Sequence, residues 1–182
     1  MTQRLIRRAA NQSRVAVADL LEAVLIAELI APGTRLMLVS PWISDFPIID
    51  NRSGQFSQLD TQWSATRIRL SSVLRSLLSR GVWISIACSS GDRENAFIDQ
   101  LRFLAETDGT ENLLRVRRDE ALGRGMNHEK ALVADSWAIH GSMNFTYSGV
   151  ELNGELVTFT DDAEAVSALA TELQPLFGDS VD

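Results

Sequence analysis

The sequence of 182 residues is poor in cysteine and histidine, and each shortage excludes a kind of site. A single cysteine, Cys88, excludes an intramolecular disulfide and any zinc site built from several cysteines. Because Cys88 stands in the apolar run 82–88, we expect a small buried residue rather than a reactive thiol. The two histidines, His128 and His140, lack further ligands at suitable spacing, so we expect no metal and no cofactor.

Positive charge is also scarce. A net charge of −7 argues against a protein that coats nucleic acid in general. The positive charge is unevenly placed, however, and four arginines directly precede His128: Arg115, Arg117, Arg118 and Arg124. Taken alone, such a cluster is usually a solvated face. Its position beside His128 favours a local positive groove that guides a nucleic-acid backbone.

No long hydrophobic run is present. The segment 16–30 is rich in apolar residues, but Asp19, Glu22 and Glu28 interrupt it. These charges spoil both the core of a signal peptide and a membrane span. Leucines recur there at helical spacing, which predicts an amphipathic helix over 13–31. We therefore expect a cytoplasmic protein that does not cross a membrane.

Helical and strand patterns alternate along the rest of the chain, which predicts an α/β sandwich with a mixed sheet flanked by helices. The expected helices cover 13–31, 65–80, 92–107 and 163–174. The expected strands cover 35–40, 82–88, 113–117, 129–135, 137–140 and 156–160. The length suits one hydrophobic core, so we expect residues 1–182 to form a single domain.

Residues 44–64 show no clear periodicity and are expected to form a loop. A loop of this length is uncommon in a compact domain and is often functional. The four tryptophans are expected to lie mostly in the core. Trp63 is the best candidate for exposure, because it falls in this loop.

Against these shortages stands the only lysine in the chain, Lys130, two residues after His128. The remaining positive side chains are all arginine, and the two residue types are not interchangeable at a tight anionic site. In an extended segment, residues two apart share a face, so His128 and Lys130 should project together with Glu129 opposite. A neutral imidazole can attack phosphorus, and an ammonium can hold the phosphate oxygens. The three-residue pattern by itself is common, and an ordinary polar loop explains it equally well.

A wider constellation follows this pair at fixed spacing: His128-x-Lys130-x4-Asp135-x5-Gly141-Ser142-x-Asn144, then Asn153-x-Glu155. It resembles the HKD signature of the phospholipase D superfamily, including the family's Gly-Ser-x-Asn turn. Asp135 and Gly141 would then be structural and shape the hairpin between two strands. The spacer between them holds five residues where the family usually has six, so we expect a tighter hairpin.

The resemblance implies a role for each polar residue of the motif. His128 would be the nucleophile that forms a phosphohistidine, and Glu155 would orient its ring. The phosphate would be bound by Lys130, Ser142 and Asn144. The family's chemistry needs no metal. It uses two histidines, one as nucleophile and one as general acid, normally from two motif copies.

A chain with one lysine cannot hold a second motif copy. The resemblance therefore implies a homodimer in which two His128 side chains face each other across a two-fold axis. The expected activity is that of a metal-independent phosphodiesterase acting on nucleic acid, with DNA cleavage in a defence or restriction system as the expected role. Two alternatives stay open: a phospholipid-hydrolysing enzyme, and a nucleic-acid-binding subunit that needs partner proteins for turnover.

A narrower resemblance rests on the segment 40–45 and the residues 47–52 that follow. They are similar to one subgroup of the superfamily: the phospholipase D-like component of bacterial gene clusters that insert 7-deazaguanine derivatives into DNA and restrict unmodified DNA. This resemblance implies partner proteins of a defence system. It involves a loop and no catalytic residue.

Overall fold

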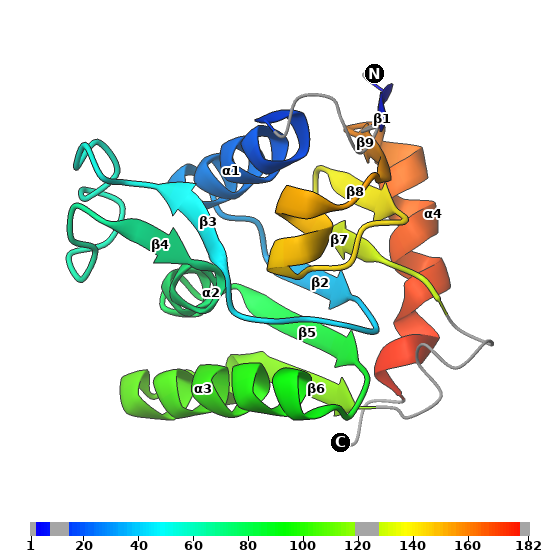
Figure 1. The fold of residues 1–182 in the computed structure, drawn as a ribbon. Coiled ribbons are helices and arrows are strands. Elements are labelled where there is room, and N and C mark those ends of the chain that lie inside the picture. The colour runs from blue at the N-terminus through cyan, green and yellow to red at the C-terminus, as the bar shows by residue number, and fades with distance from the viewer. Residues whose placement is uncertain (1–2, 8–14, 119–127, 179–182) are drawn as a thin grey trace.

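The computed structural model describes residues 3–7, 15–118 and 128–178. A mixed sheet of seven strands forms its centre, in the order β1-β9-β8-β7-β2-β5-β6 (Figure 1). The strands are β1 (Gln3–Arg7), β2 (Arg35–Val39), β5 (Trp83–Cys88), β6 (Leu114–Arg118), β7 (Ala131–Val133), β8 (Ala138–Gly141) and β9 (Leu156–Thr160). The expected mixed-sheet α/β fold is confirmed.

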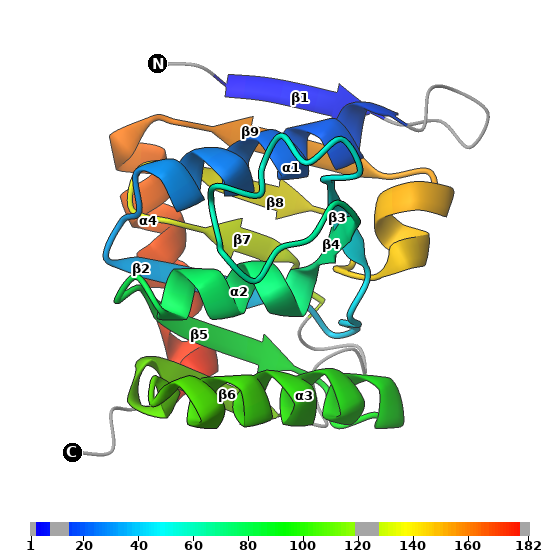
Figure 2. The same cartoon turned by 90° about the vertical axis from the view of Figure 1, so that its left-hand side faces the viewer.

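Helices cover both faces of this sheet (Figures 1 and 2). One face carries α1 (Val15–Ile30), α2 (Leu70–Leu78) and α3 (Asp92–Asp108). The other carries α4 (Ala163–Leu173) and the short η3 (Gln174–Phe177). Two further short helical turns are η1 (Glu111–Leu113) and η2 (Ser148–Leu152).

Strand alternation divides the hydrophobic residues between two cores. In β2, Leu36 and Leu38 join the core under α1, α2 and α3, whereas Met37 and Val39 join the core under α4. A strand buried on both faces reads as a continuous apolar run, which is why β2 was recognisable in the sequence.

The strand directions bring several chain segments to one edge of the sheet. β2 runs parallel to β5 and antiparallel to β7, so Val39 at the end of β2 pairs with Ala131 at the start of β7. Through β8, the register continues to Gly141, which pairs with Val157 in β9. The ends of β2 and β8 therefore meet the beginnings of β7 and β9. This row of strand ends, which includes Val39, Ala131, Gly141 and Leu156, is called the site edge of the sheet below.

The segment between β2 and β5 departs from the sequence prediction. The expected loop 44–64 contains β3 (Pro47–Asp50), and the expected helix 65–80 begins with β4 (Arg67–Arg69). These two short strands pair antiparallel as a separate ribbon (Figure 2). Buried Asn51 holds the connection between them: its amide donates to the Ser57 hydroxyl at 3.0 Å. Such strands are defined by their partner rather than by periodicity, so the sequence does not reveal them.

One further strand was not predicted, and the expectations for three tryptophans were wrong. Strand β1 was missed; it pairs with β9 at the edge of the sheet. Trp63 is buried, at 7% exposed, because it lies against the core rather than in open loop. Trp42 and Trp83, expected in the core, are 45% and 56% exposed. By contrast, Cys88 is fully buried, and burial raises the pKa of its thiol to about 11.

Within the described residues, none of the helices combines the length and the apolar character needed to cross a membrane.

Candidate active site

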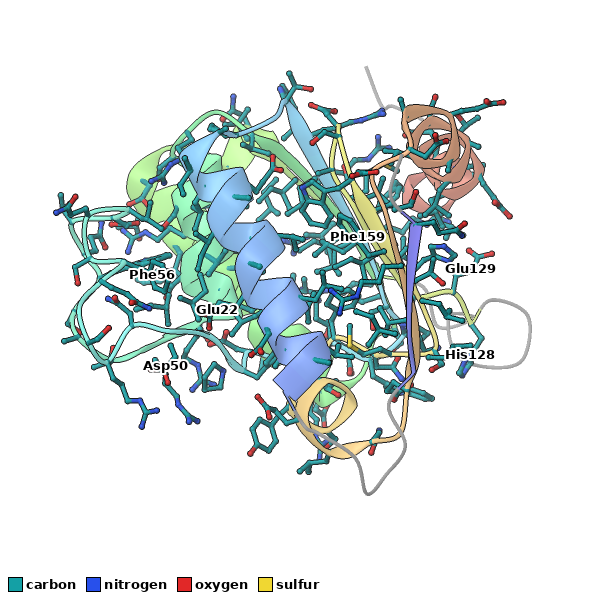
Figure 3. The ribbon with its side chains drawn as sticks, turned by 90° about the horizontal axis from the view of Figure 1, so that it is seen from above. Glu22, Asp50, Phe56, His128, Glu129 and Phe159 are labelled. Carbon is teal, nitrogen blue, oxygen red and sulfur yellow. The ribbon has the colours of Figure 1, made fainter. Side chains whose placement is uncertain are left out.

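His128 and Lys130 lie together at the sheet edge where β7 begins. The Lys130 Nζ is 2.7 Å from His128 Nδ1 and donates a second hydrogen bond to the His128 carbonyl oxygen, also at 2.7 Å. Lys130 is 3% exposed, whereas His128 and Glu129 are exposed at the surface (Figure 3). The predicted juxtaposition of imidazole and ammonium is therefore present in the geometry.

Lys130 is a buried cation beside a mostly apolar cavity. The small cavity beside it is lined by Ile139, Met143, Phe145 and Val157, together with His140 and Gly141. Burial lowers the pKa of Lys130, and the nearby Glu155 carboxylate opposes this effect by favouring the charged form. A poorly hydrated ammonium interacts strongly with an anion placed at its open side, because little water screens the charge.

Glu155 contacts a different partner from the one expected. Its carboxylate accepts a hydrogen bond from the Ser142 hydroxyl, and that same hydroxyl accepts one from the Leu156 backbone N–H at 3.0 Å. Glu155 interacts with Lys130 through charge, and no hydrogen bond joins the two side chains in the described part of the chain. Glu155 thus fixes Ser142 and balances Lys130, and no hydrogen bond joins it to His128 among the described residues.

Asn144 lies beside Ser40 of the neighbouring strand end. The buried Ser40 hydroxyl lies 3.4 Å from Asn144 Oδ1 and accepts a hydrogen bond from the Phe145 backbone N–H at 3.1 Å. With its carbonyl oxygen turned towards Ser40, the Asn144 amide keeps its NH₂ donors for another acceptor. An anion at the sheet edge would supply such an acceptor.

The segment 40–45 contributes a residue that sequence reasoning missed. The Trp42 ring meets His128 edge-on, with 5.6 Å between ring centroids and 79° between planes. Its backbone is fixed by Ser40, whose hydroxyl donates to the Trp42 carbonyl oxygen at 2.7 Å. The position of Trp42 at a strand end was a usable signal, but tryptophan's general preference for the core outweighed it.

Asp135 lies at the opposite end of β7 from Lys130 and binds the start of β2. It accepts hydrogen bonds from the Thr34 backbone N–H and from the Thr34 hydroxyl at 2.7 Å, and it pairs with Arg35 at 3.1 Å. Burial alone would raise the pKa of Asp135, but the Thr34 hydrogen bonds and the Arg35 charge together lower it. Gly141, at the end of β8, adopts φ +152° and leaves no room for a Cβ beside the Leu156 carbonyl.

The arginines proposed to guide nucleic acid are spread over both faces of β6. Arg118, at the end of β6 nearest the site edge, pairs with Asp99 of α3 at 2.8 Å. Arg115 points to the other side and donates to the Gly178 carbonyl at 2.8 Å, and Arg117 lies beside the same residue. Arg124 lies outside the described residues. The three described arginines therefore do not form one surface, and Arg118 is the one that lies at the site edge.

A second hollow opens between α1, the β3–β4 ribbon and η2. Its charged lining is mostly acidic: Asp19, Glu22, Asp50 and Glu151, with Arg67 as the counter-charge. Figure 3 shows Glu22 and Asp50 on the far side of α1 from His128. A negative lining repels phosphate, so this hollow is not the phosphate site. Among the described residues, no group of three or more potential ligands could hold a metal ion.

Comparison with models of protein families identifies the family to which the chain belongs. The model of the family described as cardiolipin synthase, PLD-like domain, matches residues 53–177, which is more than half of the chain. The chain therefore belongs to the phospholipase D-like domain family. No curated protein sequence matches it.

Solved structures with the same fold cover nearly the whole chain. Nuc from Salmonella typhimurium, a phospholipase D family member, has a TM-score of 0.59 at 15% identity, over 95% of this chain and 91% of its own. NucT from Helicobacter pylori has a TM-score of 0.57 at 16% identity, over 96% and 94%. Polyphosphate kinase from Porphyromonas gingivalis has a TM-score of 0.60 at 15% identity, over 98% of this chain and 26% of its own. At these identities the likeness concerns the fold, so substrate must be argued from the site.

Proposed function

We propose that this chain is a metal-independent phosphodiesterase that cleaves nucleic acid through a phosphohistidine intermediate, at a site shared by two copies of the chain. The observation that carries the proposal is the exposed His128 ring, held 2.7 Å from the buried Lys130 ammonium beside Ser142 and Asn144. This arrangement offers a nucleophile, a cation and neutral donors to one phosphate group.

The contact between Lys130 and His128 suggests how the resting site becomes nucleophilic. A charged Lys130 donates to Nδ1, which leaves the ring hydrogen on Nε2. A bound phosphate would draw the ammonium to its own oxygens and free Nδ1 to carry the hydrogen. Nε2 would then have its lone pair available for attack, as a nucleophile requires.

Two steps complete the reaction in the proposed dimer. Nε2 of one His128 forms a bond to phosphorus as the bond to the leaving oxygen breaks, and the second His128 gives that oxygen a proton. The second His128 then takes a proton from water, whose oxygen attacks phosphorus and breaks the P–N bond. In both steps Lys130 and Asn144 hold the remaining phosphate oxygens, and Ser142 joins them by turning its hydroxyl from Glu155 to the phosphate.

Two features support nucleic acid as the substrate. Arg118 lies at the site edge, and the arginine-rich segment 115–124 leads into His128 in the sequence. Phosphate backbones are bound chiefly by such side chains. A role within a DNA restriction system rests on the sequence of the segment 40–52 and would bring partner proteins with it.

Phospholipid hydrolysis is a second candidate, because Trp42 and Leu156 place apolar surface near the motif, at 45% exposed each. An apolar rim around the site is better suited to binding a lipid than to binding a polynucleotide. The third candidate is a nucleic-acid-binding subunit without turnover. It can be distinguished from both enzymes because it would form no covalent adduct at His128.

The deciding experiment incubates the protein with single-stranded DNA, duplex DNA, RNA and phosphatidylcholine vesicles in excess EDTA. We expect cleavage of nucleic acid, abolished in His128→Ala and retained in Glu129→Gln, which changes the exposed neighbour. Wild-type reactions quenched with alkaline denaturant should contain phosphate on His128 that is stable in alkali and released by acid. Activity lost in EDTA and restored by magnesium would contradict the mechanism, and cleavage of the vesicles alone would establish the lipid alternative.

A further inference from the structure

Trp42 is the exposed aromatic side chain that touches the proposed nucleophile. Its indole is 45% exposed while its ring contacts His128 at 5.6 Å. Single exposed apolar residues are normal on protein surfaces and need no function by themselves. The contact with His128 sets Trp42 apart, because any substrate phosphate attacked by that ring must pass within reach of the indole.

The backbone on both sides of Trp42 is anchored. The Pro41 carbonyl oxygen accepts hydrogen bonds from the Ser89 N–H at 3.0 Å and the Ser89 hydroxyl at 2.6 Å. On the other side, Ile43 is fully buried and bridges to Phe145. An exposed indole on a fixed backbone is a preformed platform, and binding to it orders few additional rotamers.

An indole face next to a phosphate site suits one ligand chemistry well. Aromatic side chains stack on nucleobases irrespective of base identity, because every base has a π-face. In a duplex the bases are already stacked on their neighbours, whereas in a single strand they are free to turn outward. We propose that Trp42 forms a base-stacking subsite beside His128 and makes single-stranded nucleic acid the preferred substrate. This inference rests on the proposed phosphodiesterase function.

Kinetics on two matched strands test the subsite separately from the chemistry. The first is a single-stranded oligonucleotide, and the second has the same sugar-phosphate backbone with abasic residues throughout. Trp42→Leu should lower kcat/KM on the first by about 5- to 150-fold, the range expected for loss of one stacked base. Trp42→Phe should retain part of the rate, and on the abasic strand the loss in Trp42→Leu should be several-fold smaller than on the first strand.

Fluorescence gives a second readout that does not depend on turnover. Thymidine 3′,5′-bisphosphate carries a base and phosphates but no diester to cleave. It should quench tryptophan emission in the wild type and in Trp83→Phe, but not in Trp42→Phe. Trp83 is a matched control, because it is 56% exposed and pairs with Arg35 at the opposite end of the sheet from His128.

The possible failures are distinguishable. If the wild type cleaves neither strand in EDTA, the proposed function itself is wrong. If Trp42→Leu loses activity equally on both strands, Trp42 acts only by orienting His128 and the subsite is refuted. If the Trp42 variants change the sedimentation of the protein from dimer to monomer, the indole is covered by a second copy and is unavailable to a base.

Discussion

At the residue scale, the site depends on how a single buried ammonium is presented. Lys130 touches both the His128 ring and the His128 carbonyl, and the cavity beside it is lined mostly by apolar side chains. A guanidinium is planar, wider and fixed in its donor directions, so it cannot reproduce both contacts in the same space. Charge alone therefore does not define this position.

Lys130→Arg should lower kcat by about 10²- to 10³-fold, the usual effect of removing one preorganised contact to a transition-state anion. Thermal unfolding should show that the fold is retained. Arg52→Lys is the matched control, since its 63% exposed side chain pairs with Asp50 away from the site, and it should leave kcat unchanged. A wild-type rate in Lys130→Arg would place Lys130 outside the phosphate site.

Asp135 is a residue whose effect should be visible in stability rather than in catalysis. Its folded-state pKa lies below the ordinary 3.8, so the unfolded chain binds the proton more readily. The stability from the carboxylate is fully present above pH 3.8 and is lost as pH falls through the depressed folded-state pKa.

Asp135→Asn should reduce the free energy of unfolding at neutral pH by about 1–2 kcal/mol, a value discounted because the carboxylate is partly exposed. Urea unfolding between pH 7 and pH 2 measures the gap between the two proteins. The gap should stay constant from pH 7 to pH 5 and close at the acid end. A gap that widens on acidification would reverse the assigned sign.

The residues that the sequence alone could place are those that strand alternation decides. His128 and Lys130 are two apart in an extended segment, and they do meet. Ser40 and Trp42 could not be placed, because they reach the motif from more than 80 positions away in the chain, through the pairing of β2 with β7. The partner of Glu155 was equally hidden, since both Ser142 and His128 were chemically reasonable.

At the element scale, the long helices and the buried parallel strands could be read from the sequence, and the short paired strands could not. β2 and β5 are continuous apolar runs with a glycine or proline signal nearby. β1, β3 and β4 gain their hydrogen bonds only from partners distant in the chain. Helix α3 begins at the expected residue: Gly91 is its N-cap, and Asp92 lies in the first turn, where its negative charge suits the helix dipole.

The turn from β8 into the Ser142–Asn144 region depends on one glycine. At Gly141 the backbone has φ +152°, and a Cβ would collide with the Leu156 carbonyl of β9. Gly141→Ala should therefore cost about 2–5 kcal/mol through backbone strain and overpacking together. It should also displace Ser142 from Glu155 and lower activity.

Gly81→Ala provides the control for that substitution. Gly81 also has a positive φ, +84°, but nothing lies within 4 Å of its Cβ position. It should cost about 1–2 kcal/mol from strain alone and leave kcat unchanged. Denaturant unfolding and steady-state rates of both variants make the comparison; equal losses in stability would show that the contact with β9 is unimportant.

At the scale of the whole molecule, net charge and site chemistry point in different directions. The chain carries −7 overall, and its second hollow is acidic. Long-range attraction to a polyanion is therefore weak, and binding must come from local contacts at the sheet edge. Binding to nucleic acid should accordingly weaken with rising salt along a shallow slope, because the slope reflects the number of phosphate contacts and few are expected here.

The number of chains in the assembled molecule determines whether the proposed site is complete. The described residues contain His128 beside Lys130, and the other histidine, His140, lies within β8. In the proposed mechanism the separate general acid is a second His128, which a two-fold dimer would supply. Mixing wild-type with His128→Ala protein under conditions of subunit exchange tests this. Activity should fall as the square of the wild-type fraction, because random pairing leaves both histidines intact only in wild-type dimers. Mixed dimers should still form the phosphohistidine and then stall, which analysis after an alkaline denaturing quench would detect. A linear fall in activity, or full activity of a monomer at low concentration, would show that each chain works alone.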